Sequence, residues 1–241
     1  MMNKQFAIRA LCFAGIFATA SAHATTFSGN AIGSWLNVDS SDPSDVYSVT
    51  NSDAGATAVF DWGVGVPGSF SSQFVFDGVG SDGAPLWTTS DETAFKVGDF
   101  SYRNGATYYS FGITGVDLGL AVTMVAPLGM AQNYTFDFHI TNTPNNTGNP
   151  VLDGDIVTVT SAFSPTTFNY LGATYTLALL GFSTDSGATI TSNFSSPEGA
   201  NASAGVYAKI TSQIPSVPEP GMLGLLSVGC LAMRRFISRK A

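Results

Sequence analysis

The sequence predicts an all-β protein built as an antiparallel β-sandwich, with one additional helix expected at each end of the chain. Three observations support this fold class. Ser, Thr, Val, Phe and Tyr are plentiful while only 11% of the 241 residues are charged, a composition typical of strands. Several segments alternate apolar and polar residues with a period of two. Clusters of Gly, Pro, Asn and Asp separate these segments, as turns would.

The first expected element is a secretory signal helix formed by residues 1–24. Lys4 and Arg9 precede an apolar stretch, and Ala22 and Ala24 occupy the small-residue positions of a signal-peptidase site. We therefore expect export through the Sec translocon, with cleavage after Ala24.

Seven alternating runs follow, and each is interpreted as a strand. The two clearest are Val116–Met124 and Tyr134–Thr141, where apolar residues occupy every second position. The other runs are residues 58–64, 73–76, 156–162, 173–180 and 206–211. Turn clusters are predicted at residues 39–45, 78–85 and 143–155. The sequence thus predicts one exported domain, residues 25–214, with roughly eight to twelve strands.

The C-terminal segment, residues 215–241, has three parts. Pro218 and Pro220 make the first part extended, because proline fixes φ and disfavours helix in the residue before it. The apolar run of residues 221–233 would form a helix of about 20 Å, shorter than the roughly 30 Å of bilayer hydrocarbon. A basic tail follows, formed by Arg234, Arg235, Arg239 and Lys240. Its charge favours a cytoplasmic C-terminus; the alternative is a core helix that ends in charges.

Val-Pro-Glu-Pro, the short apolar helix and the closing basic cluster together resemble the PEP-CTERM sorting signal of Gram-negative bacteria that make extracellular polysaccharide. The resemblance implies that an exosortase in the inner membrane recognises Pro218, Glu219 and Pro220. This chain would be the substrate of that enzyme. It would pass through an inner-membrane stage, transient or anchored, and then reach the cell surface or the extracellular space.

The expected exported domain is strongly acidic. Between residues 25 and 220 the chain has three cations and all seventeen acidic residues, which gives a formal charge of −14. Such a surface repels polyanions, so nucleic acid is excluded as a partner. The same span contains no cysteine, and disulfide bonds therefore cannot stabilise it.

Six ordered landmarks in this domain are similar to those of the choice-of-anchor K domain, which occurs in the THxN group of PEP-CTERM proteins. The landmarks are Gly33–Asn37, Asp61–Gly63, Phe136–Asn145, Gly154–Thr158, Tyr175–Phe182 and Val206–Ile210. The Thr-His-x-Asn tetrad of that group corresponds to Ser101, Tyr102, Arg103 and Asn104, of which only Asn104 is identical. The resemblance implies a PEP-CTERM surface protein and assigns it no reaction.

The side chains of the domain give little support for catalysis. Nucleophilic catalysis needs an imidazole beside the nucleophile, and the domain has only His139, on the polar side of its strand. A zinc site would lack Cys and His ligands at usable spacing. Neighbouring carboxylates could hydrolyse glycosides, and the adjacent pairs are Asp153 with Asp155 and Asp91 with Glu92. We expect no enzyme activity and no cofactor.

Calcium is a candidate ligand for two acidic loops, because hard cations bind loop carboxylates and carbonyl oxygens. The candidate residues are Asp39, Asp42, Asp45, Asp153 and Asp155. Neither loop has the Gly and Glu spacing of an EF-hand. The alternative is that each aspartate caps backbone groups of its own turn.

Six aromatic residues are candidates for sugar contacts, because Trp and Tyr rings stack on pyranose rings. They are Trp35, Trp62, Trp87, Tyr102, Tyr108 and Tyr109. The alternative for each is a place in the core. Three functions are therefore compatible with the sequence: a structural surface or matrix protein within extracellular polysaccharide, a carbohydrate-binding module with or without calcium, and a hydrolase.

Overall fold

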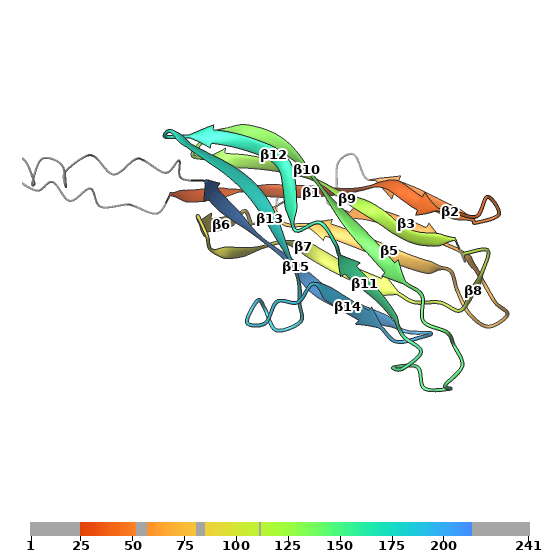
Figure 1. Ribbon diagram of the computed structural model, residues 1–241. Coiled ribbons are helices and arrows are strands. Elements are labelled where there is room, and N and C mark those ends of the chain that lie inside the picture. The colour runs from red at the N-terminus through yellow and green to blue at the C-terminus, as the bar shows by residue number, and fades with distance from the viewer. Residues whose placement is uncertain (1–24, 52–56, 81–84, 111, 214–241) are drawn as a thin grey trace, which may run out of the picture.

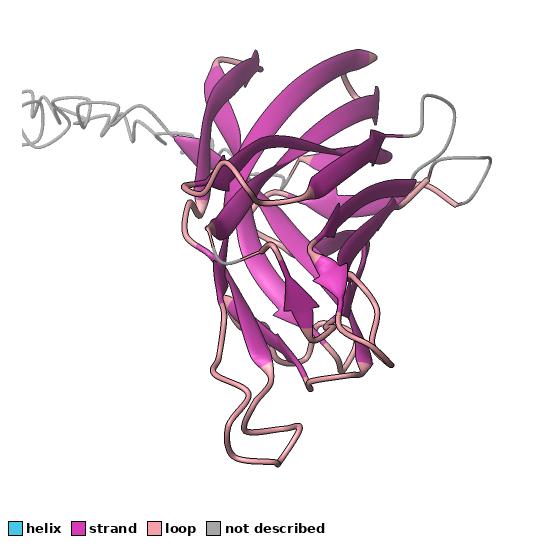
Figure 2. Cartoon of the chain, turned by 90° about the vertical axis from the view of Figure 1, so that its right-hand side faces the viewer, coloured by secondary structure: helices cyan, strands magenta, loops and turns pink. Residues whose placement is uncertain are grey.

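The computed structural model describes residues 25–213 except for 52–56, 81–84 and 111. Every regular element in these residues is a β-strand (Figures 1 and 2), which confirms the all-β prediction. The predicted signal helix with Ala22 and Ala24, the sorting motif and the basic tail all lie outside the described residues. None of the elements described is a helix long and apolar enough to cross a membrane.

Two antiparallel sheets pack against each other as a sandwich. In spatial order, the six-stranded sheet contains β14 (Asn193–Ser196), β11 (Asp155–Val159), β10 (Met130–Thr141), β9 (Ile113–Ala126), β1 (Thr26–Ser40) and β6 (Trp87–Ser90). The seven-stranded sheet contains β12 (Phe163–Tyr170), β13 (Ala173–Ser183), β15 (Asn201–Gln213), β7 (Ala94–Arg103), β5 (Ser72–Gly78), β3 (Thr57–Trp62) and β2 (Tyr47–Asn51). A small ribbon pairs β4 (Val64–Gly65) with β8 (Thr107–Tyr108).

All seven predicted runs overlap strands, but some boundaries differ. The run 58–64 is interrupted at Gly63, where φ is +72° and the chain turns from β3 into β4. The run 156–162 ends early, at Val159, and β1 extends into the turn predicted from residue 39. The described residues form fifteen strands rather than eight to twelve. Strands such as β6 and β14, with four residues each, are too short to show a period.

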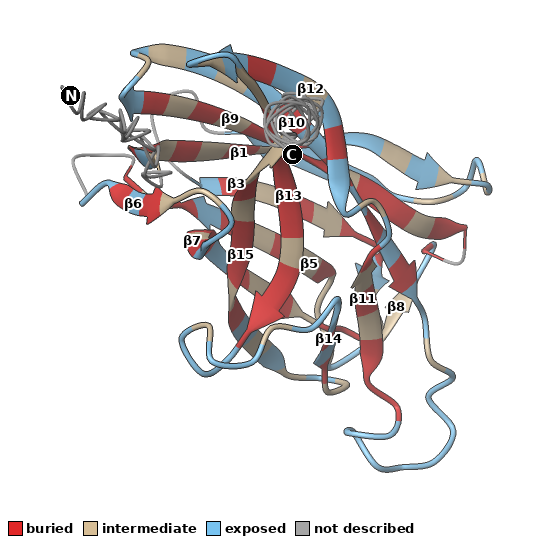
Figure 3. Ribbon diagram, turned by 60° about the vertical axis from the view of Figure 1, so that its left-hand side comes forward, coloured by how far each residue is buried: buried red, intermediate tan, exposed pale blue. Residues whose placement is uncertain are grey.

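Alternating strand residues fill the space between the sheets with aromatic side chains, and Figure 3 shows the buried positions recurring along the strands. Trp35 of β1 is central to this core. Its ring lies 5.6 Å from those of both Phe74 and Phe138, and its indole nitrogen donates a hydrogen bond to the carbonyl oxygen of Ala58 at 3.1 Å. Trp35 therefore joins the two sheets by packing and by a buried hydrogen bond.

Two glycines make room for the Phe76 ring of β5, one on the facing sheet and one on the neighbouring strand of its own sheet. A Cβ atom on Gly33 of β1 or on Gly98 of β7 would overlap the Phe76 ring. The ring therefore occupies the space that side chains would take at both positions. This close approach explains why glycine, which otherwise weakens a strand, occurs inside two long strands.

The long strand β1 defines two ends of the molecule. Its fifteen residues rise about 46 Å at roughly 3.3 Å per residue. We call the end around residues 90–93 the chain-end pole, because Asp91 N donates to Thr25 O at 3.1 Å and Ser212 N donates to a Glu92 carboxylate oxygen at 3.1 Å. We call the other end, with residues 41–46, 104–110 and 142–154, the loop pole. There Ser41 N donates to Gly112 O at 3.0 Å.

Candidate functional site

The end of β7 at the loop pole carries the segment Ser101 to Asn104 that resembles the Thr-His-x-Asn tetrad. Strand alternation directs Tyr102 into the core, where it is 0% exposed, and leaves Arg103 partly exposed on the other face. Asn104 follows the last strand residue and is also 0% exposed. The Tyr102 hydroxyl lies 3.4 Å from Asn104 Oδ1 inside the protein, whereas Arg103 points outward.

Tyr102 reaches across the sandwich to Asp155 of β11. Its hydroxyl donates to Asp155 Oδ2 at 3.0 Å, and Thr143 N donates to the other carboxylate oxygen at 2.7 Å. Burial raises the pKa of Asp155, although the hydrogen bonds from Thr143 and Tyr102 oppose the shift. Burial, followed by the charge of Asp155, raises the pKa of Tyr102. Tyr102 therefore stays protonated and serves as a donor to the buried carboxyl group.

Asn104 fixes the turn between β14 and β15. Its backbone N–H donates to Ala200 O at 2.9 Å, and its carbonyl oxygen accepts from Gly199 N at 2.9 Å. The side-chain amide donates to Ser196 O at 3.1 Å. Ser196 in turn donates its hydroxyl to Tyr102 O at 2.9 Å. Asn104 thus holds the turn that carries Glu198 against the end of β7.

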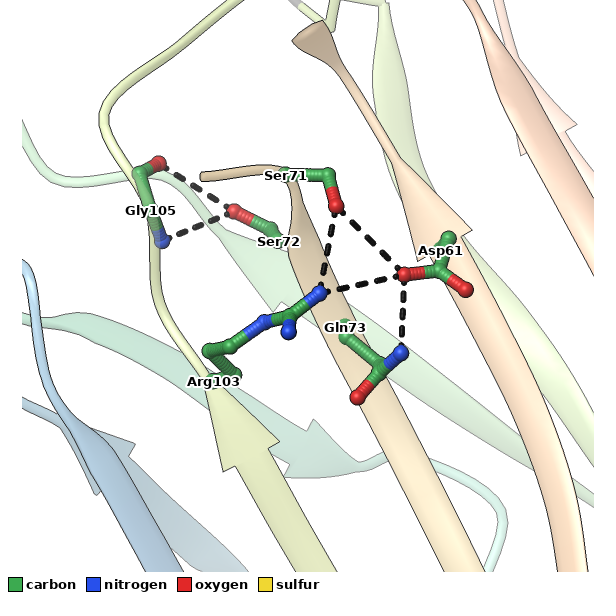
Figure 4. Close-up of polar contacts among 6 residues, drawn as sticks. All are labelled: Asp61, Ser71, Ser72, Gln73, Arg103 and Gly105. Atoms are coloured by element: carbon green, nitrogen blue, oxygen red, sulfur yellow. Dashed lines mark hydrogen bonds and ion pairs between the residues drawn. The ribbon is translucent and has the colours of Figure 1, made fainter. Parts of the chain in front are cut away.

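Arg103 forms a separate polar cluster on the outer face (Figure 4). One guanidinium nitrogen lies 3.4 Å from Asp61 Oδ1 and 3.2 Å from Ser71 Oγ, and Gln73 donates to the same Asp61 oxygen at 2.9 Å. The guanidinium also lies over the Phe70 ring, 5.2 Å from its centroid. Both charged side chains of the ion pair are about a third exposed, so the pair contributes at most about 1 kcal/mol to stability.

A cavity of about 230 Å³ lies beside the tetrad at the loop pole. Its walls come from four parts of the chain that are distant in sequence. The lining residues whose side chains are best suited to bind a ligand are Trp62, Thr107, Asn142, Asn145, Asp155 and Glu198. We call this the loop-pole pocket. It combines one aromatic wall with a hydroxyl, two amides and two carboxyl groups. These polar groups form hydrogen bonds with hydroxylated ligands.

Glu198 is the least satisfied polar residue of the loop-pole pocket. Its Oε1 atom is buried and has no hydrogen-bond partner among the described residues. Burial raises the pKa of Glu198, and the charge of Asp155 raises it further, while a hydrogen bond from Asn145 lowers it. An acceptor that is buried and unpaired favours a ligand that brings a donor.

Three exposed tyrosines lie on segments that adjoin the lining residues of the loop-pole pocket. Thr107 lines the pocket, and the next two residues, Tyr108 and Tyr109, are 51% and 54% exposed. Val46 N donates to Tyr109 O at 2.9 Å, which brings Tyr47, 49% exposed, to the same end of the molecule. Tyr109 has φ +56°, a backbone conformation that is uncommon for a bulky residue and is concentrated at functional sites.

The structure corrects the prediction of sugar contacts for part of the aromatic set. Trp35, Trp87 and Tyr102 are 1%, 4% and 0% exposed and are packed among other rings. Their faces are therefore covered by protein. Trp62 is 5% exposed but contributes to the pocket wall, and Tyr108 is exposed. The alternation of each strand decides these outcomes, because an aromatic residue on the inner face enters the core.

The first acidic loop uses its carboxylates inside the protein. Asp39 accepts from the Thr114 hydroxyl at 2.6 Å. Asp45 accepts from the Ser40 hydroxyl at 2.7 Å and from Gly112 N at 3.2 Å. Asp42 caps its own turn, and the backbone N–H and then the hydroxyl of Ser44 lower its pKa. These contacts match the alternative in which the aspartates organise turns.

The second acidic loop separates its two aspartates. Asp153 accepts from Thr147 N at 3.0 Å, and hydrogen bonds, first from the Thr147 side chain, lower its pKa, whereas Asp155 points to Tyr102. Among the residues that the structure describes, no three His, Cys, Asp or Glu side chains come together to hold a metal ion. The five candidate aspartates therefore form no cluster of three carboxylates in this part of the chain.

The other carboxylate pair, Asp91 and Glu92, lies at the chain-end pole, where Glu92 pairs with Lys209 at 3.0 Å. His139 is exposed on β10, as alternation predicted. Sequence reasoning missed Glu198, because Ser-Pro-Glu-Gly has the composition of an ordinary turn. Only the fold places this residue beside Asp155.

No family model matches this chain, and no curated protein matches it either.

Proposed function

We propose that this chain is an exported cell-surface or extracellular-matrix protein with a structural, non-enzymatic role within a layer of extracellular polysaccharide. In this proposal the Sec translocon exports the chain and the C-terminal segment holds it in the inner membrane. An exosortase then cuts near Pro218, Glu219 and Pro220. The support from sequence is the order of leader, acidic domain, proline motif, apolar run and basic tail.

One observation of the fold carries the proposal: the first and last described strands meet at the chain-end pole. The turn at residues 90–93 contacts Thr25 through Asp91 N and contacts β15 through Glu92, whose backbone N–H donates to Ile210 O at 2.8 Å. In Figure 1, β1 begins and β15 ends on the same side, and β8 lies on the opposite side. A domain tethered through either end would therefore point its loop pole away from the membrane.

The test is the intact mass and the location of the native protein in cells with and without their exosortase. We expect a mature species that runs from Thr25 to near Pro220, that lies outside the cell, and that depends on the enzyme. A full-length C-terminus retained in the inner membrane in both strains would contradict the sorting proposal.

A second candidate function, carbohydrate binding, is favoured by the loop-pole pocket. Amides and carboxyl groups line a cavity of about 230 Å³, and exposed tyrosines lie on adjoining segments; such groups suit sugar hydroxyls and pyranose faces. Binding is favoured over hydrolysis because both oxygens of Asp155 already accept hydrogen bonds from Tyr102 and Thr143. Burial raises the pKa of Asp155, whereas these two hydrogen bonds lower it and so oppose its use as a base.

A glycan array with the purified protein tests this second function, with and without a chelator. We expect retained glycans to be lost in Asn145→Ala and Glu198→Gln, because both side chains line the pocket. Asn169→Ala is the matched control, since Asn169 is an exposed asparagine on β12. Equal retention by all three variants would exclude the pocket, and loss on chelation would add a metal to the site.

A further inference from the structure

A long groove crosses the outer face of the seven-stranded sheet and shares no residue with the loop-pole pocket. Two cavities of about 980 and 430 Å³ adjoin there, and Lys96, Asp99 and Tyr207 line both. We call the combined depression the outer groove, and its defining residues are Trp87, Lys96, Asp99, Ser183, Ser203 and Tyr207. The part on the outer face crosses β13, β15, β7 and β5, so three strand spacings make it about 14 Å long. Trp87, at one end of the groove, lies on β6 of the six-stranded sheet.

Irregular strand pairing builds the middle of the outer groove. The register of β7 shifts between Gly98 and Lys96, which marks a β-bulge. On a regular strand Lys96 and Asp99, three residues apart, would face opposite sides. The bulge brings both to the outer face, where their side chains form an ion pair at 2.6 Å. The register of β13 also shifts, opposite the same residue, Tyr207. Bulges of this kind often re-aim side chains beside binding sites.

Tyr207 lies on the outer side of β15, against the loop that follows β13. A Cβ atom on Gly187 of that loop would lie 2.7 Å from Cε1 of Tyr207, so glycine lets the loop approach the ring. Asp185 fixes the loop by accepting from the Ser183 hydroxyl at 2.7 Å and from Thr189 N at 2.8 Å. Tyr207 is therefore a rigid aromatic wall and not a mobile surface side chain.

Trp87 supplies an independent indication of a ligand. Its ring packs on Phe95 with a centroid distance of 4.6 Å, and the residue is 4% exposed. The indole nitrogen is buried and has no hydrogen-bond partner among the described residues. An unpaired buried N–H is costly, and this one belongs to a residue that lines the larger cavity of the groove. A ligand oxygen that reaches this nitrogen from the groove would give it a partner.

We propose that the outer groove binds one strand of an uncharged polysaccharide. Tyr207 offers an aromatic wall, the Lys96–Asp99 pair offers a donor beside an acceptor, and serine hydroxyls line the far end. An anionic polysaccharide is disfavoured, because the span of residues 25–220 has a formal charge of −14. The inference rests on the proposed function in one respect, since that function places the protein among extracellular polysaccharides.

The test is affinity electrophoresis of the native protein in gels that contain dextran, xylan, hydroxyethyl cellulose, alginate or gelatin. We expect at least one of the three neutral polysaccharides to slow migration, and alginate and gelatin not to. The double variant Lys96→Ala with Asp99→Ala should weaken that retardation by about tenfold or more. Both side chains are substantially exposed, at 39% and 61%, so this variant should fold. Lys209→Ala with Glu92→Ala is the matched control, because it removes an ion pair outside the groove.

The outcomes separate the groove from the other proposals. Slower migration that persists in Lys96→Ala with Asp99→Ala but disappears in Asn145→Ala would overturn the proposal for the outer groove. It would place binding at the loop-pole pocket instead. An equal loss in the control pair, no retardation by any neutral polysaccharide, or retardation by gelatin alone would also overturn the proposal for the outer groove. The mass and location of the native protein decide the export proposal separately, because that result does not depend on glycan affinity.

Discussion

Tyr102 and Asp155, which are 53 positions apart, are joined by a buried hydrogen bond of 3.0 Å that links the seven-stranded sheet to the six-stranded sheet. The bond has two roles. It gives a buried carboxyl group one of its donors, and it fixes one wall of the loop-pole pocket. Stability and pocket geometry are therefore coupled through the tyrosine of the tetrad.

Replacing Tyr102 by Phe should destabilise the protein by about 1 to 3 kcal/mol, because the change leaves a buried carboxyl oxygen without its donor. The ring itself would remain and would keep its packing against Phe74 at 4.8 Å. Urea unfolding at pH 7 measures the effect. Tyr108→Phe is the control, since Tyr108 is half exposed. Equal stability of the two variants would show that the Tyr102–Asp155 bond contributes nothing.

Replacing Asn104 by Ala should loosen the turn at residues 197–200 more than the rest of the sandwich. The substitution removes the amide that donates to Ser196 O, while the two backbone hydrogen bonds to Gly199 and Ala200 remain possible. Hydrogen exchange should therefore become faster in this turn first, as expected for local opening. Uniformly faster exchange in all strands would instead indicate that Asn104 acts on global stability.

The core strands could be predicted from the sequence because alternation is a local property. Val116–Met124 shows it without interruption, and the structure places this run inside β9. The strand β7 could not be predicted in this way. Its bulge between Lys96 and Gly98 breaks the period of two, so the pattern of buried residues changes phase in the middle of the strand.

The residues of the candidate sites could likewise be predicted only in part. The sequence indicates Asp155 through the nearby Asp153, and Asn104 through the resemblance of the tetrad. Their partners come from elsewhere in the chain: Asn104 and Ser196 are 92 positions apart. Glu198 is held at the pocket by the contacts of Asn104 with its turn and by its own hydrogen bond from N to Pro150 O at 2.9 Å. Such pairings depend on strand order, which no local pattern in the sequence records.

Replacing Gly33 by Ala should destabilise the protein by about 1 to 3 kcal/mol, because the added methyl group would overlap the Phe76 ring between tightly packed sheets. Phe76→Leu makes room at the same place. If the overlap is the cause, Gly33→Ala should cost less in the Phe76→Leu background than in the native chain. Thermal unfolding of the four proteins forms a double-mutant cycle. Additive effects would mean that Gly33 is required for some other reason.

Replacing Asp117 by Asn should stabilise the protein at pH 7 and have little effect below about pH 4. Asp117 of β9 lies directly opposite Asp137 of β10. Burial, and then the hydrogen bond and charge of Asp137, raise its pKa, while a hydrogen bond from Asn37 lowers it.

A carboxyl group with a raised pKa in the folded state favours folding when protonated, so its contribution is present at low pH and is lost as pH rises through the folded pKa. The amide removes this loss because it stays uncharged. Urea unfolding of both proteins from pH 3 to pH 8 measures the difference, with Thr135→Ala as an uncharged change on the neighbouring strand β10. A stability difference that did not vary with pH would show that the two aspartates do not interact through charge.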